Sequence, residues 1–194
     1  MIASQLDLNK PLIMLIPGIL AGAECKEWID RIRLEGPAPA PINTSRGVML
    51  DSQIRNNRRV MLDDPLEAKM LFERVKDKVP EEIHEMRLSG VNERLRCYEY
   101  QAGQRFAPHS DGAFIRNERE QSWYTFMVYL NDEFEGGETV FFVEPEKAIR
   151  PETGMGLLFQ HPIIHEGAEV TKGTKYVIRT DLMYRKDATL MITV

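Results

Sequence analysis

The pattern of hydrophobic and polar positions changes near residue 90. Before that point, residues 21–34 place apolar side chains three or four positions apart, as on one face of a helix; these are Cys25, Trp28, Ile29 and Ile32. Residues 63–80 predict a second helix, in which Asp64 is suited to the N-cap and Pro65 to the first turn. A continuous apolar run at 12–16 predicts a buried strand.

From Arg94 onward, short strand-like runs alternate with clusters of Gly, Asn and Asp. The runs are RLRCYEY, WYTFMVYLN, ETVFFV, GMGLLFQH and KYVIRTDLMY. Their spacing predicts an all-β barrel or sandwich. We therefore expect a mainly β protein with N-terminal helices, built as a single domain over residues 1–194. Within it, residues 1–90 would form a helical support region and residues 91–186 the β core.

Composition narrows the classes of partner and compartment. A formal net charge of -5 and a sequence pI near 5.5 leave no basic excess to neutralise a phosphate backbone, which disfavours nucleic acid. Cys25 and Cys97 lie too far apart for a disulfide framework or a zinc site, so we expect a reducing, cytoplasmic setting. The apolar run at 11–20 is too short to cross a bilayer and lacks a cleavage pattern. We expect neither a signal peptide nor a membrane span.

Candidate chemistry starts with the stretch RFAPHSDGAF, where His109 and Asp111 are two positions apart. That spacing puts both side chains on one face of a strand or its end. His165 ends a strongly apolar run some fifty positions later. Two imidazoles and one carboxylate on one face of a metal form the facial triad of non-haem iron(II) oxygenases.

A second feature follows His165 by ten positions. Lys175, Val177 and Arg179 share one face of a β-rich run, opposite to Tyr176 and Ile178. A cation that points into a barrel without an acidic neighbour is costly unless an anion meets it. A bound dicarboxylate would meet that need.

These residues together resemble the 2-oxoglutarate- and iron(II)-dependent dioxygenases, and among them the prolyl 4-hydroxylase-like group. The resemblance covers residues 92–186 and rests on His109-x-Asp111, His165 and Lys175 at their family spacing. The segments YQAGQRFAPHSD, YLNDEFEGGETVFF and GMGLLF also match. The fold that this resemblance implies is a double-stranded β-helix, or jelly roll.

The resemblance also implies roles for individual residues. His109, Asp111 and His165 would ligate Fe(II), and Lys175 would pair with the distal carboxylate of 2-oxoglutarate. Arg179 is a competitor for that carboxylate because it shares the face of Lys175 and offers a bidentate fork. Further residues matching cosubstrate-binding positions are Tyr129, Tyr100 and, as a weaker candidate, Tyr98.

The implied reaction couples decarboxylation of 2-oxoglutarate, in the presence of O2, to hydroxylation of an aliphatic C–H. L-Ascorbate is a candidate further cofactor, and no side-chain nucleophile is needed. The expected substrate is a prolyl or other amino-acid residue, in a peptide, a protein or a small amino-acid-like molecule. The alternatives are an oxidative nucleic-acid demethylase, suggested by the spacing of Arg179 and Arg185, and a non-catalytic module that binds a metal or anion. The sequence does not define an oligomeric state.

Two loops carry candidate substrate contacts. IRNNRRV holds Arg55 and Arg58, either of which would recognise a carboxylate or carbonyl if the loop lies over the barrel mouth; a solvated polar loop is the alternative. Residues 112–122 follow the metal pair where relatives carry a mobile substrate lid. His161 and His84 are expected to be a packed, hydrogen-bonded histidine and a surface residue respectively.

Overall fold

The computed structural model describes residues 10–44 and 47–186. The ends of the expected domain, residues 1–9 and 187–194, lie outside the described residues, as do residues 45–46. The expectation of a mainly β chain with two N-terminal helices is confirmed. The helices are α1 (Gly22–Glu35) and α2 (Pro65–Val75), and a 3-10 turn (Lys76–Lys78) follows α2.

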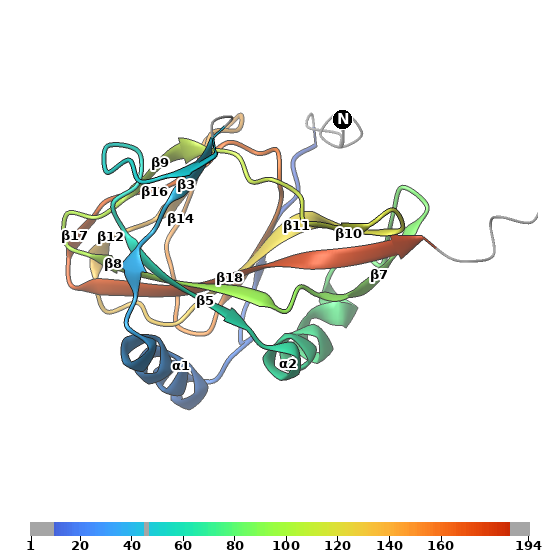
Figure 1. The fold of residues 1–194 in the computed structure, drawn as a ribbon, viewed down its shortest axis with the longest axis horizontal. Coiled ribbons are helices and arrows are strands. Elements are labelled where there is room, and N and C mark those ends of the chain that lie inside the picture. The colour runs from blue at the N-terminus through green and yellow to red at the C-terminus, as the bar shows by residue number, and fades with distance from the viewer. Residues whose placement is uncertain (1–9, 45–46, 187–194) are drawn as a thin grey trace, which may run out of the picture.

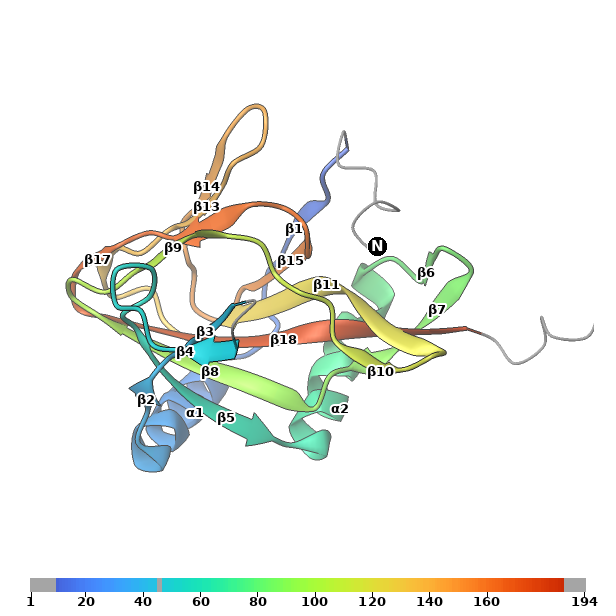
Figure 2. The ribbon, with the colours of Figure 1, turned by 45° about the horizontal axis from the view of Figure 1, so that its top comes forward.

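Antiparallel strands form a large sheet that faces a smaller one (Figures 1 and 2), which is the predicted jelly roll. In spatial order, the main path is β1 (Ile13–Ile16), β15 (Gly156–Gln160), β11 (Glu120–Tyr129), β18 (Thr174–Lys186), β8 (Arg94–Gln101), β5 (Arg58–Asp63) and β2 (Ala38–Pro39). Three further strands extend this sheet: β10 (Ile115–Asn117), β6 (Glu82–Ile83) and β7 (Met86–Val91).

The smaller sheet has the order β14 (Lys147–Ile149), β13 (Thr139–Phe141), β16 (His165–Gly167) and β9 (Phe106–His109). Two short ladders complete the described strands: β12 (Glu135–Gly136) with β17 (Val170–Lys172), and β3 (Ile42–Thr44) with β4 (Gly47–Met49). The first ninety residues thus supply strands of the main sheet as well as both helices.

Both helices begin at the positions that their sequences predict. The Asp64 carboxylate accepts a hydrogen bond from the Glu67 amide at the start of α2, and Pro65 occupies its first turn. At the start of α1, the Glu24 carboxylate accepts from the Ala21 amide. Arg74 Nη2 lies 2.6 Å from Glu24 Oε1 and so joins the two helices. They lie side by side against one face of the main sheet (Figure 1).

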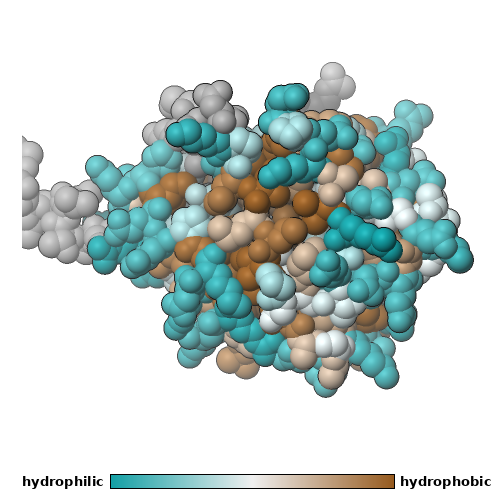
Figure 3. All heavy atoms as spheres, turned by 180° about the vertical axis from the view of Figure 1, so that it is seen from behind, coloured by the Kyte–Doolittle hydropathy of each residue, from teal (hydrophilic) through white to brown (hydrophobic). Residues whose placement is uncertain are grey.

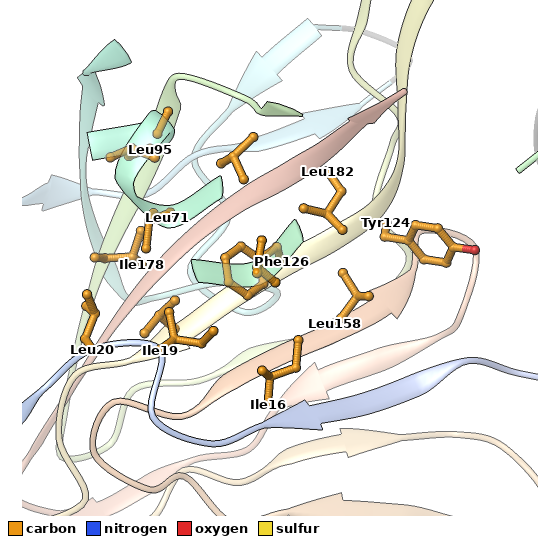
Figure 4. Packing of buried hydrophobic residues seen from close by; sticks show 14 of the residues in the cluster. Ile16, Ile19, Leu20, Leu71, Leu95, Tyr124, Phe126, Leu158, Ile178 and Leu182 are labelled. Carbon is orange, nitrogen blue, oxygen red and sulfur yellow. The ribbon is translucent and has the colours of Figure 1, made fainter. Parts of the chain in front are cut away.

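The main sheet has a hydrophobic core on each face because its strands alternate side chains between the two. Toward the helices, Phe126, Leu158 and Ile178 pack with Leu71 of α2, as Figure 4 shows. Toward the smaller sheet lie side chains of the opposite parity, namely Tyr98, Tyr100, Tyr129, Phe159 and Val177. The alternation predicted for residues 175–179 is confirmed, and it directs Lys175 and Arg179 into the roll.

Some hydrophobic side chains also reach the surface. Figure 3 shows a hydrophobic area amid hydrophilic side chains on the face seen from behind. Exposed large apolar residues include Leu15 on β1, Phe142 and Ile164. Apolar atoms commonly make up much of a folded protein's surface. Within the described residues, no helix is long and apolar enough to cross a membrane.

Candidate metal centre and adjoining cavity

The predicted triad converges where the smaller sheet joins β9 to β16. His109 ends β9 and His165 begins β16, and the two residues are direct partners in this antiparallel pair. Asp111 lies two residues beyond His109; its Oδ1 is 3.9 Å from His109 Nε2 and its Oδ2 is 3.7 Å from His165 Nε2. One ligand atom from each residue lies within 4.8 Å of the others, close enough to share a metal ion.

Backbone carbonyls orient both imidazoles for metal binding. His109 Nδ1 lies 2.8 Å from the Ala107 carbonyl oxygen, and His165 Nδ1 lies 3.0 Å from that of Ile163. Since a carbonyl can only accept, each Nδ1 carries the proton and each Nε2 keeps a lone pair that can ligate a metal beside Asp111. Burial, and the neighbouring His165, lower the pKa of His109 to about 4, and burial lowers that of His165. The donor set is therefore two neutral imidazoles and a carboxylate, which fits Fe(II).

Asp111 is fixed at both carboxylate oxygens. Arg179 Nη2 lies 3.0 Å from Oδ1, and the Thr125 hydroxyl donates to Oδ2 at 2.6 Å. The Asp111 amide donates to the carbonyl oxygen of His161 at 2.9 Å. Burial alone would raise the pKa of Asp111, but Arg179 and then the two histidines hold it well below its usual range. The carboxylate is thus anionic and oriented before any metal binds.

His161 supports this arrangement, a role that the sequence analysis missed. It is buried, as expected of a packed histidine; its Nδ1 lies 3.0 Å from Thr125 Oγ1 and its Nε2 lies 2.8 Å from Ser122 Oγ. Because Thr125 gives its proton to Asp111, its oxygen accepts from His161 Nδ1–H, and His161 Nε2 then accepts from Ser122. Ser122 Oγ in turn accepts from the Phe114 amide, so the 112–122 segment is hydrogen-bonded to the metal side. Burial lowers the pKa of His161 to about 4, in keeping with this neutral form.

A cavity of about 780 Å³ adjoins the triad. Aromatic rings line its walls, and Lys175 lies on the same inward face of β18 as Arg179. Five cations line it against two carboxylates: Arg55, Arg59, Arg96, Lys175 and Arg179 against Asp111 and Glu166. An anionic ligand therefore suits this cavity better than a cationic one.

Lys175 is a buried cation of this cavity that forms no ion pair with an acid among the described residues. It is 2% exposed, and its Nζ donates to the Gly137 carbonyl oxygen at 2.6 Å. The rings of Tyr100 and Tyr129 lie 5.4 and 5.3 Å from Nζ, and the Tyr129 hydroxyl is 2.6 Å from Thr139 Oγ1. Burial lowers the pKa of Lys175 to about 7. Of the residues proposed from sequence to hold the cosubstrate, Lys175, Tyr100 and Tyr129 thus lie together. Arg179 instead pairs with Asp111, and the Tyr98 ring lies against Arg55.

Position 137, in the GGETVF segment, requires glycine because of its backbone angle and its close neighbours. Gly137 has φ +70°, and a Cβ there would lie 3.0 Å from Phe134 Cε2 and 3.3 Å from Lys175 Cδ. The same residue supplies the carbonyl oxygen that accepts from Lys175. Glycine therefore lets the backbone approach the lysine closely enough to fix its ammonium group.

The structure separates the two arginines of the polar loop. Arg55 is 6% exposed and lines the cavity, with its Cζ 4.7 Å from the Tyr98 ring centroid. Arg58 is exposed, does not line the cavity, and donates through Nε to the Pro37 carbonyl oxygen. Of the two arginines predicted to contact substrate, only Arg55 lines the cavity, whereas Arg58 lies outside it.

Two further expectations concern basic and surface residues. Arg185, proposed with Arg179 as a nucleic-acid signature, has a 59% exposed side chain at the end of β18 and lies 3.7 Å from Glu120. It does not line the cavity. His84 is exposed in the turn between β6 and β7, as expected, with its ring against Trp123.

Comparison with known proteins agrees with this geometry. The model of the 2OG-Fe(II) oxygenase superfamily matches residues 95–180. "Probable prolyl 4-hydroxylase 8" of Arabidopsis thaliana is 30% identical over 142 residues, which cover 68% of this chain and 45% of that protein. The chain thus spans less than half the length of this relative.

Solved structures establish the fold. The viral collagen prolyl hydroxylase of Paramecium bursaria Chlorella virus-1, in its 2OG complex, superposes with a TM-score of 0.62 at 22% identity and covers 92% of this chain and 98% of its own. The Trichoplax adhaerens prolyl hydroxylase, in complex with a hypoxia inducible factor peptide fragment, gives a TM-score of 0.67 at 16% identity, covering 94% and 87%.

Fold, triad and family match together define the class. Residues 95–180 match the 2OG-Fe(II) oxygenase superfamily, whose cofactors are Fe(II), 2-oxoglutarate and O2, and the triad that they contain fits Fe(II). Within that superfamily its sequence is similar to prolyl 4-hydroxylases.

Proposed function

We propose that this chain hydroxylates an aliphatic carbon of a prolyl or other amino-acid residue, coupled to decarboxylation of 2-oxoglutarate. The observation that carries the proposal is one cavity that contains the triad near Arg179 and an acid-free buried cation, Lys175. A metal-binding module without catalysis would not need to bury that cation. Bound Fe(II) and 2-oxoglutarate would supply the oxidising chemistry; the protein's contribution is to bind, orient and exclude water.

Separate residues would bind the metal and the cosubstrate. His109, Asp111 and His165 would hold the metal through Nε2, a carboxylate oxygen and Nε2. Lys175 would pair with the distal carboxylate of 2-oxoglutarate, and Tyr129 and Tyr100 would flank that pair with their rings. Arg179 is proposed instead to orient Asp111, since its Nη2 already lies 3.0 Å from that carboxylate.

The substrate is proposed to be a peptide, a protein or a small amino-acid-like molecule. The likeness to a prolyl hydroxylase that was solved in complex with a peptide fragment supports a peptide substrate. The cavity is large enough for a substrate side chain beside the cosubstrate. Nucleic acid is disfavoured because Arg185 lies outside the cavity and the chain is acidic.

We also propose a reducing, cytoplasmic compartment. Cys25 and Cys97 are both buried free thiols. Free thiols without disulfides are typical of proteins in reducing compartments. Cell fractionation with an antibody to the chain tests this, and recovery in an oxidising compartment would contradict it.

Succinate formation tests the function directly. Purified protein with Fe(II) and 2-oxoglutarate, with and without L-ascorbate, should form succinate, and anaerobic Fe(II) protein should gain a charge-transfer absorption when 2-oxoglutarate is added. Asp111→Ala should lose both signals and bound iron, whereas Asp77→Ala, at an exposed position on the 3-10 turn, should keep them. Iron binding without the absorption band or succinate would favour the non-catalytic module.

A further inference from the structure

Two buried guanidinium nitrogens in the cavity have no hydrogen-bond partner. In the part of the chain that the structure describes, they are the only such buried side-chain atoms: Arg55 Nη2 and Arg179 Nε. Both residues line the cavity beside the triad. An unsatisfied buried donor costs about 1–3 kcal/mol, more when charged. Arg179 already pairs with the Asp111 carboxylate, so Arg55 is the residue that mainly lacks an acceptor.

The ion pairs of the cavity also single out Arg55. Arg96 lies 3.2 Å from Asp181, and Arg179 lies 3.0 Å from Asp111. Neither Arg55 nor Arg59 forms an ion pair with an acid among residues 10–44 and 47–186. Burial lowers the pKa of Arg59, and although Tyr98 opposes this, the charges of Arg55 and Arg96 add to it. Two guanidinium groups therefore remain without an ion-paired acid after Lys175 is assigned to 2-oxoglutarate, and the lining holds one further carboxylate, Glu166.

Arg55 is held rigidly next to the metal ligands. Its Nε donates to Asn57 Oδ1 at 2.7 Å, and its Cζ lies 4.2 Å from the Phe106 ring centroid. Phe106 stacks on His109 with centroids 3.5 Å apart, so a single ring separates the guanidinium from a metal ligand. The Ala107 amide donates to the Ile54 carbonyl oxygen at 2.8 Å, which fastens the loop of Arg55 to β9. A group bound by Arg55 would thus lie close to the reacting centre.

We propose that the substrate of this enzyme presents a carboxylate, and that Arg55, with Arg59 beside it, binds that carboxylate in a subsite opposite Lys175. A rigid guanidinium fork suits a planar carboxylate because it can donate two parallel hydrogen bonds. The carboxylate would belong either to a free amino acid or to the C-terminus of a peptide, two sources with the same chemistry. This inference rests on the proposed function, since the cosubstrate must already occupy Lys175.

Matched acids and amides test the subsite without turnover. Protein loaded with Mn(II) and saturating 2-oxoglutarate is titrated calorimetrically with L-proline and L-prolinamide, and with N-acetylglycyl-proline and its amide. We expect at least one acid to bind at least tenfold more tightly than its amide. Preference for L-proline would identify a free amino acid, and preference for the acetylated acid a peptide C-terminus.

Variants assign the effect to the arginines. Arg55→Gln should abolish the preference for the acid. Arg59→Gln, which changes a half-buried side chain, should reduce that preference by at least threefold and serves as the test if Arg55→Gln does not fold. Arg58→Gln is the matched control and should keep the preference, because Arg58 lies outside the cavity. Equal binding of acids and amides, no binding by either acid, or a preference that survives in the folded cavity variants would overturn the inference.

The two proposals fail separately. If the wild-type protein forms no succinate from 2-oxoglutarate with Fe(II), the proposed function fails whatever the titrations show. If it forms succinate but does not distinguish acids from amides, only the carboxylate subsite is wrong.

Discussion

Replacing Lys175 by methionine should stabilise the ligand-free protein and weaken its binding of 2-oxoglutarate. The folded environment lowers the lysine's pKa from its ordinary 10.5 to about 7, a difference worth about 5 kcal/mol of unfavourable free energy in the charged form. The substitution loses the hydrogen bond to Gly137, worth about 1 kcal/mol. Allowing for imperfect packing of methionine, we expect a net gain of roughly 1–4 kcal/mol at pH 6, seen as a rise in Tm of about 3–10 °C.

The pH dependence of this gain has a defined sign. Between about pH 7 and 10.5 the unfolded state binds a proton at Lys175 that the folded state does not, so wild-type stability rises with pH. Below pH 7 both states are protonated and the full penalty applies; above 10.5 neither is, and it vanishes. The advantage of Lys175→Met over wild type should therefore be largest below pH 7 and shrink as pH rises toward 10.5.

Ligand binding should move in the opposite direction. Truncating one partner of a buried charge pair costs about 2–5 kcal/mol, so the affinity for 2-oxoglutarate should fall at least roughly 30-fold. The assay is thermal unfolding of the Mn(II) protein with and without 2-oxoglutarate. Lys172→Met is the matched control, because Lys172 is exposed on the adjacent β17 and pairs with Glu135. A Lys175→Met protein that keeps the 2-oxoglutarate-induced rise in Tm would refute the assignment.

Three further predictions concern the metal side and the thiols. Thr125→Val removes the hydroxyl that donates to Asp111 and should weaken Mn(II) binding about 10- to 100-fold by calorimetry, whereas Thr171→Val, at an exposed position, should not; equal affinities would contradict the supporting role of Thr125. Because the pKa of His109 is lowered to about 4, Mn(II) affinity should stay level from pH 8 to about 5.5, and a decline that begins near pH 6.5 would show an unperturbed imidazole. Burial raises the pKa of Cys97 to about 12, so iodoacetamide followed by mass spectrometry should label it only after unfolding.

Much of the site could be predicted because its signals are local or regularly spaced. The two-residue period of a strand was enough to place Lys175 and Arg179 on one inward face, and capping chemistry was enough to start α2 at Pro65. The triad needed a third ligand from a distant strand, which the apolar run before His165 supplied. Resemblance to a family then gave these patterns a common geometry.

The remaining features depend on contacts between strands that a single sequence does not encode. Thr125 reaches both Asp111 and His161 only because β11 pairs with β15 in a register that brings it opposite Phe159. Arg55 and Arg58 lie in one polar stretch, and an isolated bridge between Arg55 and Phe106 turns the first inward. Neither the register nor that bridge has a local sequence signal, so the choice between the two arginines could not be made beforehand.

The distinction between Lys175 and Arg179 follows from the geometry of one strand. Both side chains enter the cavity from β18, but they are four residues apart, which separates their Cα atoms by roughly 13 Å along an extended strand. Arg179 lies at the metal end, where it pairs with Asp111, and Lys175 lies at the other end against Gly137. A dicarboxylate that chelates the metal with one end has its second carboxylate directed away from the metal. We therefore expect β18 to act as a spacer that assigns the metal carboxylate to Arg179 and the distal carboxylate to Lys175, a division that the sequence had left open.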